Sequence, residues 1–219
     1  MKGILFDFNG TLFWDSPKND KAWQQFALNH TGQCMTEEAL LTLHGLPNTT
    51  TLEHILNRTL APDEVSLLSE EKERIYRALC LHDPAGMNLA PGAPEMLNAL
   101  KASGIPYTIA TSADNKNLDF YYEYMALDNW FDRKLIVCSD GKLPGKPAPD
   151  FYLEAARRLC LDPRDLIVCE DSSTGIASAL SAGIGRVVHI IPPTSSTVER
   201  IEGCFTWAPD FVTWRDWFR

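Results

Sequence analysis

MKGILFDFNGTLF, residues 1–13, decides how the rest of the chain is interpreted. Its uncharged run at residues 3–6 stops at Asp7, and Gly10 and Thr11 turn the chain directly afterwards. This pattern predicts a short buried strand that carries a carboxylate at its C-terminal tip. In open α/β sheets the ligand-binding crevice lies outside the carboxyl ends of the strands. We therefore expect Asp7 to lie at the functional site and later segments to supply its partners.

The second half of the chain alternates helical stretches with short apolar runs. Such alternation predicts a parallel sheet that is covered by helices on both faces. The fold class predicted is α/β, a doubly wound, Rossmann-like parallel sheet. The expected strands are 106–110, 134–138, 165–169 and 186–191, the expected helices are 95–102, 114–125, 149–160 and 172–182, and 207–219 is expected to be a final packing element.

Residues 16–84 have helical periodicity and no strand pattern. Ala22, Trp23 and Phe26 have the spacing of one helix face. Ser16 followed by Pro17 predicts a helix start with Ser16 as the N-cap. We therefore expect two domains, an α/β core of residues 1–15 and 85–219 and a helical domain of residues 16–84 inserted after the first strand.

The composition is typical of a soluble globular protein, with 45% hydrophobic and 22% charged residues among 219. A net charge of −9 argues against nucleic acid or an anionic membrane as a partner. No apolar run approaches the roughly 18 residues of a membrane-spanning helix. The six cysteines show no CxxC pair, which predicts buried free thiols in a reducing compartment. We expect a cytoplasmic monomer or weak homodimer.

Polar residues follow the predicted strands at the points where they end. Asp7 follows the first predicted strand, Thr111-Ser112 the second and Glu170-Asp171 the fourth. Lys146 lies in a loop that its neighbouring prolines stiffen. Each piece alone has a structural explanation, because a strand-end carboxylate often complements a helix N-terminus and a lone lysine is usually a solvated charge. Four such pieces at the strand ends of one sheet favour a common site.

These residue types suit phosphoryl transfer. Asp7 can attack phosphorus and form an aspartyl-phosphate, which splits the displacement into two steps. Mg²⁺ prefers hard oxygen ligands, which Asp7, Asp171 and the backbone carbonyl of Asn9 can supply. Without such a cation, an anionic nucleophile would meet an anionic phosphate among carboxylates. Lys146 and the Thr111 hydroxyl can hold the phosphoryl oxygens as charge develops.

The set resembles the haloacid dehalogenase (HAD) superfamily, in its phosphatase and β-phosphoglucomutase-like branch with a helical cap. The resemblance covers nearly the whole chain. The matching segments are Asp7-Phe8-Asn9-Gly10-Thr11-Leu12, Ala110-Thr111-Ser112, Gly145-Lys146-Pro147-Ala148-Pro149-Asp150 and Glu170-Asp171-Ser172-Ser173-Thr174-Gly175.

The resemblance implies a role for each matching residue. Asp7 is the implied nucleophile, Thr111 and Lys146 bind phosphate, and Glu170 and Asp171 are the acids of a Mg²⁺ site. The helical segment is the implied cap, which supplies specificity for a small-molecule phosphate ester. Candidates for binding the rest of the substrate are Ser112, beside the phosphate-binding threonine, and His44 and Asn48 in the cap.

Asn9 departs from the family pattern, in which phosphatases usually carry a second aspartate at this position. That aspartate protonates the leaving oxygen and then deprotonates the attacking water, whereas an amide does not titrate. His44 is one substitute, since cap closure would bring it over Asp7.

The predicted function is a Mg²⁺-dependent phosphatase. A phosphomutase is the first alternative, although mutase relatives have an arginine where Asn48 stands. The second is a phospho-ligand binder that has lost turnover.

Overall fold

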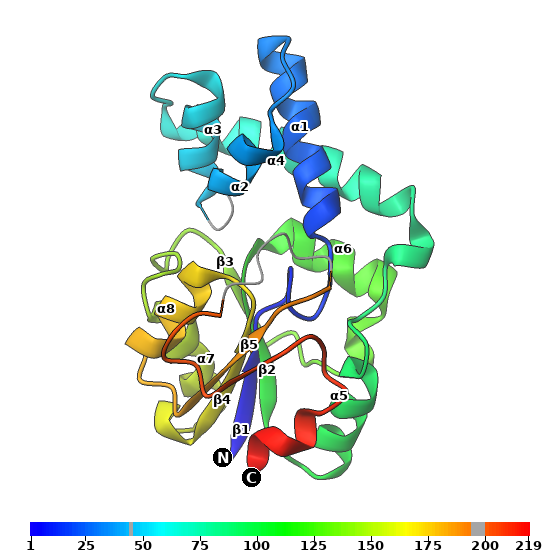
Figure 1. Ribbon diagram of the computed structural model, residues 1–219, viewed down its shortest axis with the longest axis vertical. Helices are drawn as coiled ribbons and strands as arrows, with labels where there is room; N and C mark the ends of the chain where they lie inside the picture. Colours follow the sequence, from blue (N-terminus) through cyan, green and yellow to red (C-terminus); the bar gives the residue numbers. More distant parts are fainter. Residues whose placement is uncertain (44–45, 194–199) are drawn as a thin grey trace. The chain divides into compact units, whose positions relative to one another are not determined.

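The computed structural model describes residues 1–43, 46–193 and 200–219, which form two compact units (Figure 1). The first unit comprises residues 1–14 and 88–219, and the second comprises residues 15–87. The first contains the sheet, and the second is built from helices. Each unit is described by itself below.

A parallel sheet of six strands forms the centre of the first unit, in the order β3-β2-β1-β4-β5-β6. This confirms the predicted α/β fold class. The strands are β1 (Gly3–Phe6), β2 (Tyr107–Asp114), β3 (Val137–Ser139), β4 (Leu166–Glu170), β5 (Arg186–Ile190) and β6 (Thr206–Ala208).

The strand order reverses beside β1, which places its end at the point where such sheets bind ligands. Phe6 of β1 pairs with Cys169 of β4 on one side and with Ile109 of β2 on the other. Asp7, which follows β1, and Glu170, which ends β4, therefore reach the same edge of the sheet.

Helices cover both faces of this sheet, with α7 and α8 on one side and α5 and α6 on the other in Figure 1. They are α5 (Ala93–Ala102), α6 (Asn115–Met125), α7 (Asp150–Arg158) and α8 (Ser173–Ser181), and short 3-10 helices occur at Pro84–Gly86, Leu127–Asn129, Pro163–Asp165 and Trp214–Phe218. Asp114 and Ser172 are N-caps, since their side chains accept from the amides of Asn117 and Gly175.

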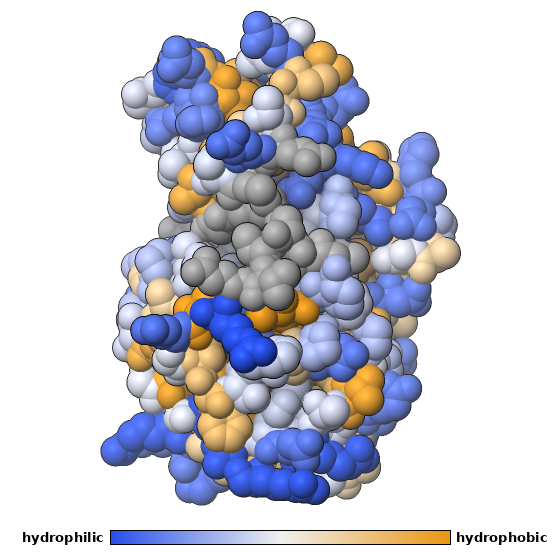
Figure 2. Space-filling model, viewed as in Figure 1, coloured by the Kyte–Doolittle hydropathy of each residue, from blue (hydrophilic) through white to orange (hydrophobic). Residues whose placement is uncertain are grey.

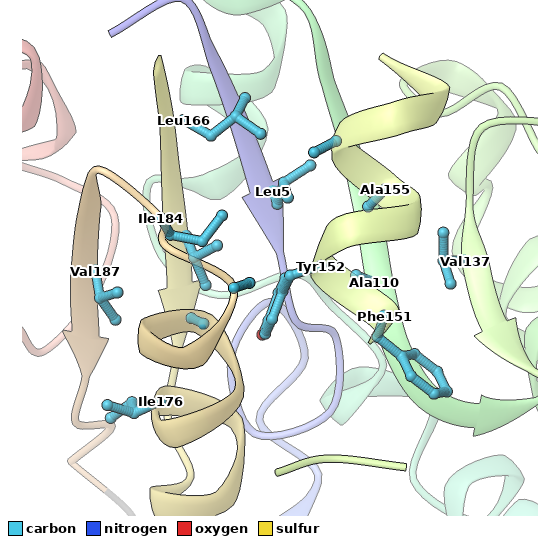
Figure 3. Packing of buried hydrophobic residues seen from close by; sticks show 14 residues of the cluster. Leu5, Ala110, Val137, Phe151, Tyr152, Ala155, Leu166, Ile176, Ile184 and Val187 are labelled. Carbon is cyan, nitrogen blue, oxygen red and sulfur yellow. The ribbon is translucent and has the colours of Figure 1, made fainter. Parts of the chain in front are cut away.

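The core between the sheet and α7 and α8 is apolar and fully buried. Figure 3 shows Leu5 and Val187 of the sheet facing Ala155 of α7 and Ile176 of α8. Tyr152 belongs to this core, and its side chain points from α7 toward the carboxyl end of β1. A residue of the hydrophobic core thus carries a hydroxyl group into the region of the strand ends.

Several predicted strand boundaries differ from those observed. β3 begins at Val137 instead of residue 134, because the backbone amides of Leu135 and Ile136 bond to preceding carbonyls in a turn. β2 continues to Asp114, beyond the predicted end at residue 110. β6 (Thr206–Ala208) overlaps the start of segment 207–219, for which only a packing element was predicted.

The second unit consists of α1 (Ser16–Thr31), α2 (Glu37–Leu43), α3 (Asn48–Leu56) and α4 (Pro62–Leu81). Its apolar core contains Trp23 and Phe26, the pair whose spacing predicted a buried helix face. The prediction that Ser16 is the N-cap is wrong, because Ser16 is already helical and Asp15 holds the cap position. Asp15 accepts a hydrogen bond from Tyr76 of α4 instead (2.5 Å).

On the face seen in Figure 2, hydrophobic residues occur in small groups among hydrophilic ones. None of the helices in the described part of the chain is both long enough and apolar enough to cross a membrane. All six cysteines are free. Cys80 and Cys169 are buried, but Cys34 and Cys160 are exposed, so the prediction that the thiols are buried is only partly right.

Candidate active site

Lys146 is the centre of the polar cluster at the strand ends. Its Nζ lies 2.6 Å from Asp7 Oδ1 and 2.7 Å from Glu170 Oε1, and it donates to the Tyr152 hydroxyl at 3.0 Å. The Lys146 side chain is only 5% exposed, and the adjoining loop is anchored where Ser178 Oγ donates to the carbonyl of Ala148 (2.6 Å). The predicted nucleophile, lysine and strand-end acid are therefore in direct contact.

Glu170 is held by hydrogen bonds at both carboxylate oxygens. Oε1 accepts from Lys146 and from the Tyr152 hydroxyl (3.2 Å). Oε2 accepts from the backbone amide and the hydroxyl of Ser172, at 2.7 and 3.0 Å. Gly175 lies against this carboxylate so closely that a Cβ there would overlap it. Glycine is required at this position because any side chain would displace Glu170.

Asp171 contacts the loop that follows Asp7. Its Oδ1 accepts a hydrogen bond from the fully buried Thr11 hydroxyl (2.7 Å). Gly10, with φ of +80°, approaches the same carboxylate, and a Cβ would overlap it. The Gly-Thr pair after β1 therefore does more than turn the chain, because it also positions the second acid of β4.

The cluster holds three carboxylates, those of Asp7, Glu170 and Asp171, around one lysine. Burial alone would lower the pKa of Lys146, but attraction by Asp7 and Glu170 outweighs it and raises that pKa above its ordinary value. Burial, together with repulsion by Glu170 and Asp7, holds the pKa of Asp171 well above its ordinary range. The site carries more negative charge than its lysine neutralises.

A divalent cation fits this donor set, because Asp7 and Asp171 offer hard oxygen ligands and a cation would relieve their repulsion. In the described residues, no group of three His, Cys, Asp or Glu side chains has an arrangement that could hold a metal ion. A cation here would therefore take further ligands from a backbone carbonyl and water, as Mg²⁺ usually does.

Thr111 and Ser112 lie within β2, next to β1. Thr111 is 2% exposed, and its Oγ1 accepts from the backbone amide of Ala113 (3.1 Å), so the hydroxyl proton can be donated elsewhere. Ser112 is exposed on the same strand. Both candidates are thus at the carboxyl end of the sheet, as predicted.

Asn9 makes a contact that the sequence did not predict. Its Nδ2 donates to the hydroxyl of Tyr121 on α6 at 2.8 Å. Tyr121 is 1% exposed and packs its ring on Phe8, with centroids 4.6 Å apart. The residue that departs from the family pattern is therefore held by a buried tyrosine.

The remaining candidates belong to the helical segment. Asn48 begins α3, where its Nδ2 donates to Glu73 (3.3 Å), and Glu73 also pairs with the buried Lys72 (2.9 Å). His44 lies outside the described residues. Within the second unit, the half-buried Asn48 thus contacts a buried ion pair.

Three side chains that hydrogen-bond to the candidate site residues were not predicted from the sequence to do so: Thr11, Tyr121 and Tyr152. Tyr152 lies three residues before Ala155, on the apolar face of α7, where a tyrosine is expected to pack in the core. Its burial raises its pKa well above the ordinary value, as does the nearby charge of Glu170. No sequence signal separates such a tyrosine from an ordinary core residue.

The chain is similar to known proteins over most of its length. A family model described as haloacid dehalogenase-like hydrolase matches residues 1–183. Hexitol phosphatase A of Escherichia coli is 31% identical over 201 residues, covering 92% of this chain and 88% of that protein. The phosphorylated carbohydrates phosphatase of Thermotoga maritima is 28% identical over 195 residues, covering 87% and 86%.

A solved structure has the same fold over nearly its full length. The HAD hydrolase, family IA, variant 3, of Entamoeba histolytica is 37% identical, with a TM-score of 0.88. The match covers 96% of this chain and 94% of that one. The similarity thus extends through both units of the chain.

Proposed function

The chain belongs to the haloacid dehalogenase-like hydrolases, and on this premise we propose that it is a Mg²⁺-dependent phosphatase of small phosphorylated polyols or sugars. The family and the enzyme class, a HAD-type hydrolase of phosphoric esters, agree with the prediction from the sequence. The single observation that carries the reaction is the contact of Lys146 with Asp7 in a cluster of three carboxylates, of which Asp7 and Glu170 are buried.

Asp7 acts as the nucleophile. One carboxylate oxygen attacks phosphorus, the bond to the ester oxygen breaks, and a phosphoryl group is left on Asp7. Lys146 and the Thr111 hydroxyl stabilise the phosphoryl oxygens, because both are buried donors at the same sheet edge. Glu170 and Tyr152 keep the lysine ammonium in place during this step.

The cation site comprises the carboxylates of Asp7 and Asp171 and the backbone carbonyl of Asn9. Glu170 is the further acid of this site. When bound, Mg²⁺ supplies positive charge that offsets repulsion between the anionic nucleophile and the anionic substrate. Thr11 and Gly10 orient the Asp171 carboxylate toward this role.

The substrate class is inferred from the relatives and from the helical unit. Two relatives are a hexitol phosphatase and a phosphatase of phosphorylated carbohydrates, which favours a polyhydroxylated phosphate ester. The unit of residues 15–87 takes the role of the cap, in which Asn48 and His44 are candidates for binding substrate hydroxyls. Ser112 is the corresponding candidate in the core.

A panel of phosphate esters tests this proposal. With Mg²⁺ present, we expect hexitol and sugar phosphates to release inorganic phosphate with higher kcat/KM than nucleotide or amino acid phosphates. Conversion of a sugar phosphate into its positional isomer without phosphate release would instead identify a phosphomutase. Binding of phosphate esters without any turnover would identify a non-catalytic binder, the alternative that Asn9 keeps open.

The cation site can be tested without activity. Because burial and neighbouring carboxylates raise the pKa of Asp171 in the folded state, this carboxyl group keeps its proton in the folded protein at pH values where the unfolded chain has lost it. The contribution of this group to the stability of the metal-free protein is then lost as pH rises through its raised pKa. We expect Mg²⁺ to increase the thermal unfolding temperature, with an increment that grows between pH 5 and pH 7.5.

The matched control for this measurement is Asp171→Asn, which removes the shifted carboxyl and one cation ligand. This variant should lose the pH-dependent increment, and NaCl at equal ionic strength should not reproduce it in the parent protein. An increment that is the same at both pH values, or that survives in Asp171→Asn, contradicts the assignment of this site.

A further inference from the structure

We propose that a hollow beside β3, the outer strand of the sheet, is a second anion site that takes inorganic phosphate or the phosphate group of a small metabolite. The hollow is separate from the proposed reaction, because none of the residues that line it belongs to the cluster around Lys146. Its volume, its charge and its N–H donors support this assignment.

The hollow has a volume of about 220 Å³ and lies within the first unit. Leu118 of α6, Cys138 of β3 and Arg158 of α7 are among the residues that line it. Pockets for drug-sized molecules usually have volumes of roughly 300–1,000 Å³. A hollow of this size therefore suits an inorganic ion or one charged group of a small molecule.

The lining of the hollow is basic, although the chain as a whole carries a net charge of −9. It contains three cationic side chains, those of Arg133, Lys134 and Arg158, and one carboxylate, that of Asp140. Lys142 pairs with this carboxylate at 2.9 Å, so the negative charge in the lining already has a partner. The local charge therefore favours an anionic ligand.

Arg158 retains hydrogen-bonding capacity beyond the contacts that hold it. Its Nε donates to Glu154 at 2.8 Å, and its Nη1 donates to the carbonyls of Lys134 and Ile136. Its Nη2 has no hydrogen-bond partner in the described part of the chain. These contacts fix the guanidinium group at the end of α7, while its Nη2 can donate to the oxygens of an anion.

Arg133 and Lys134 add further donors from the turn before β3. Arg133 donates to Asp119 through Nη2, and its guanidinium group lies over the ring of Tyr122 at 5.3 Å. Within the residues that the structure describes, its Nε and Nη1 and the Lys134 Nζ make no hydrogen bond. Guanidinium and ammonium groups are the side-chain donors that proteins use to bind phosphate. The ligand that fits this lining is therefore a phosphate group.

Cys138 gives a chemical readout of the hollow. Its half-buried thiol lines the hollow and donates to Asn115 Oδ1 at 3.2 Å. Burial raises the pKa of this thiol, and only the thiolate is alkylated, so the reaction is run at mildly alkaline pH. Cys160 is exposed and does not line the hollow, so it serves as the internal control.

The experiment measures alkylation of Cys138 and Cys160 by iodoacetamide, with peptide mass mapping, during a titration with inorganic phosphate at constant ionic strength. At a phosphate concentration of about twice the dissociation constant, alkylation of Cys138 should slow about threefold, because only about a third of the sites are then free. Alkylation of Cys160 should be unchanged. A hexitol phosphate is titrated in the same way into Asp7→Asn, which should not hydrolyse it. Protection by both compounds supports a site for the phosphate group itself, and protection by one of them supports a site for that source alone.

Lys134→Glu is the decisive variant, because it reverses one charge of the lining and removes no side-chain hydrogen bond seen in the described residues. Within this variant, phosphate should no longer slow alkylation of Cys138. The matched control is Lys101→Glu on α5, which makes the same change of net charge outside the hollow. This control should retain the protection.

Equal slowing at Cys138 and Cys160, protection that persists in Lys134→Glu, or no protection by either compound would overturn the proposal. None of these outcomes bears on the proposed function, because turnover that depends on Asp7 is measured separately.

Discussion

Asp7→Asn is expected to lose turnover by a factor on the order of 10⁴ or more, because loss of a catalytic nucleophile removes the covalent route and not merely one contact. The amide has the size of the carboxylate but does not attack phosphorus. Phosphate release from the preferred ester of the panel, measured with Mg²⁺ present, gives the loss directly. No phosphorylated protein should be trapped on acid quenching of this variant.

The loss should occur in a folded protein. Asp7 is one of three carboxylates around Lys146, and the lysine keeps its contact with Glu170 (2.7 Å) when Asp7 becomes neutral. Removing one of several like charges from a buried cluster relieves repulsion, so the thermal unfolding temperature should not decrease. Asp128→Asn, at an exposed position, is the matched control and should retain full activity. Retention of more than about a tenth of the activity in Asp7→Asn would exclude Asp7 as the nucleophile.

The parallel sheet and the meeting of its strand-end residues could be predicted, because the carboxyl ends of parallel strands lie at one edge of the sheet. Asp7 and Glu170 lie far apart in the sequence, yet each follows an apolar run, and parallel strands bring such residues to one edge. Lys146 follows no strand directly, and it was assigned to the site from its proline-stiffened loop and from the resemblance to a family. Its ion pairs with both acids agree with that placement.

The hydrogen bonds that complete the site could not be predicted. Most of them come from residues whose sequence spacing is that of hydrophobic core residues. Tyr121 and Tyr152 lie on buried helix faces, where an apolar pattern predicts packing and is silent about a hydroxyl at the tip of the ring. Thr11 follows a turn glycine, and a turn residue has many local explanations. Such contacts are recognised only when their partner atoms, Glu170 Oε1, Asp171 Oδ1 and Asn9 Nδ2, have positions in space.

The other large effect is expected of Asn9→Asp, which should increase kcat about 10²-fold on alkyl phosphates such as hexitol phosphates. The new carboxyl group can protonate the leaving oxygen in the first step and take a proton from water in the second. Tyr121 can donate its hydroxyl to this carboxylate, so the contact that holds the native amide also holds its replacement. The gain requires no other change in the site.

The size of this gain should depend on the leaving group. p-Nitrophenolate leaves without a proton, so with p-nitrophenyl phosphate only the second step benefits, whereas a sugar or polyol alkoxide needs the proton in the first step. We therefore expect the increase in kcat/KM to be large for hexitol phosphates and small for p-nitrophenyl phosphate. The gain in kcat/KM should also diminish toward high pH, where the new carboxyl group has lost its proton before the first step. An unchanged rate on both substrates would mean that another group already transfers the proton, and Asn9 would then have no part in limiting turnover.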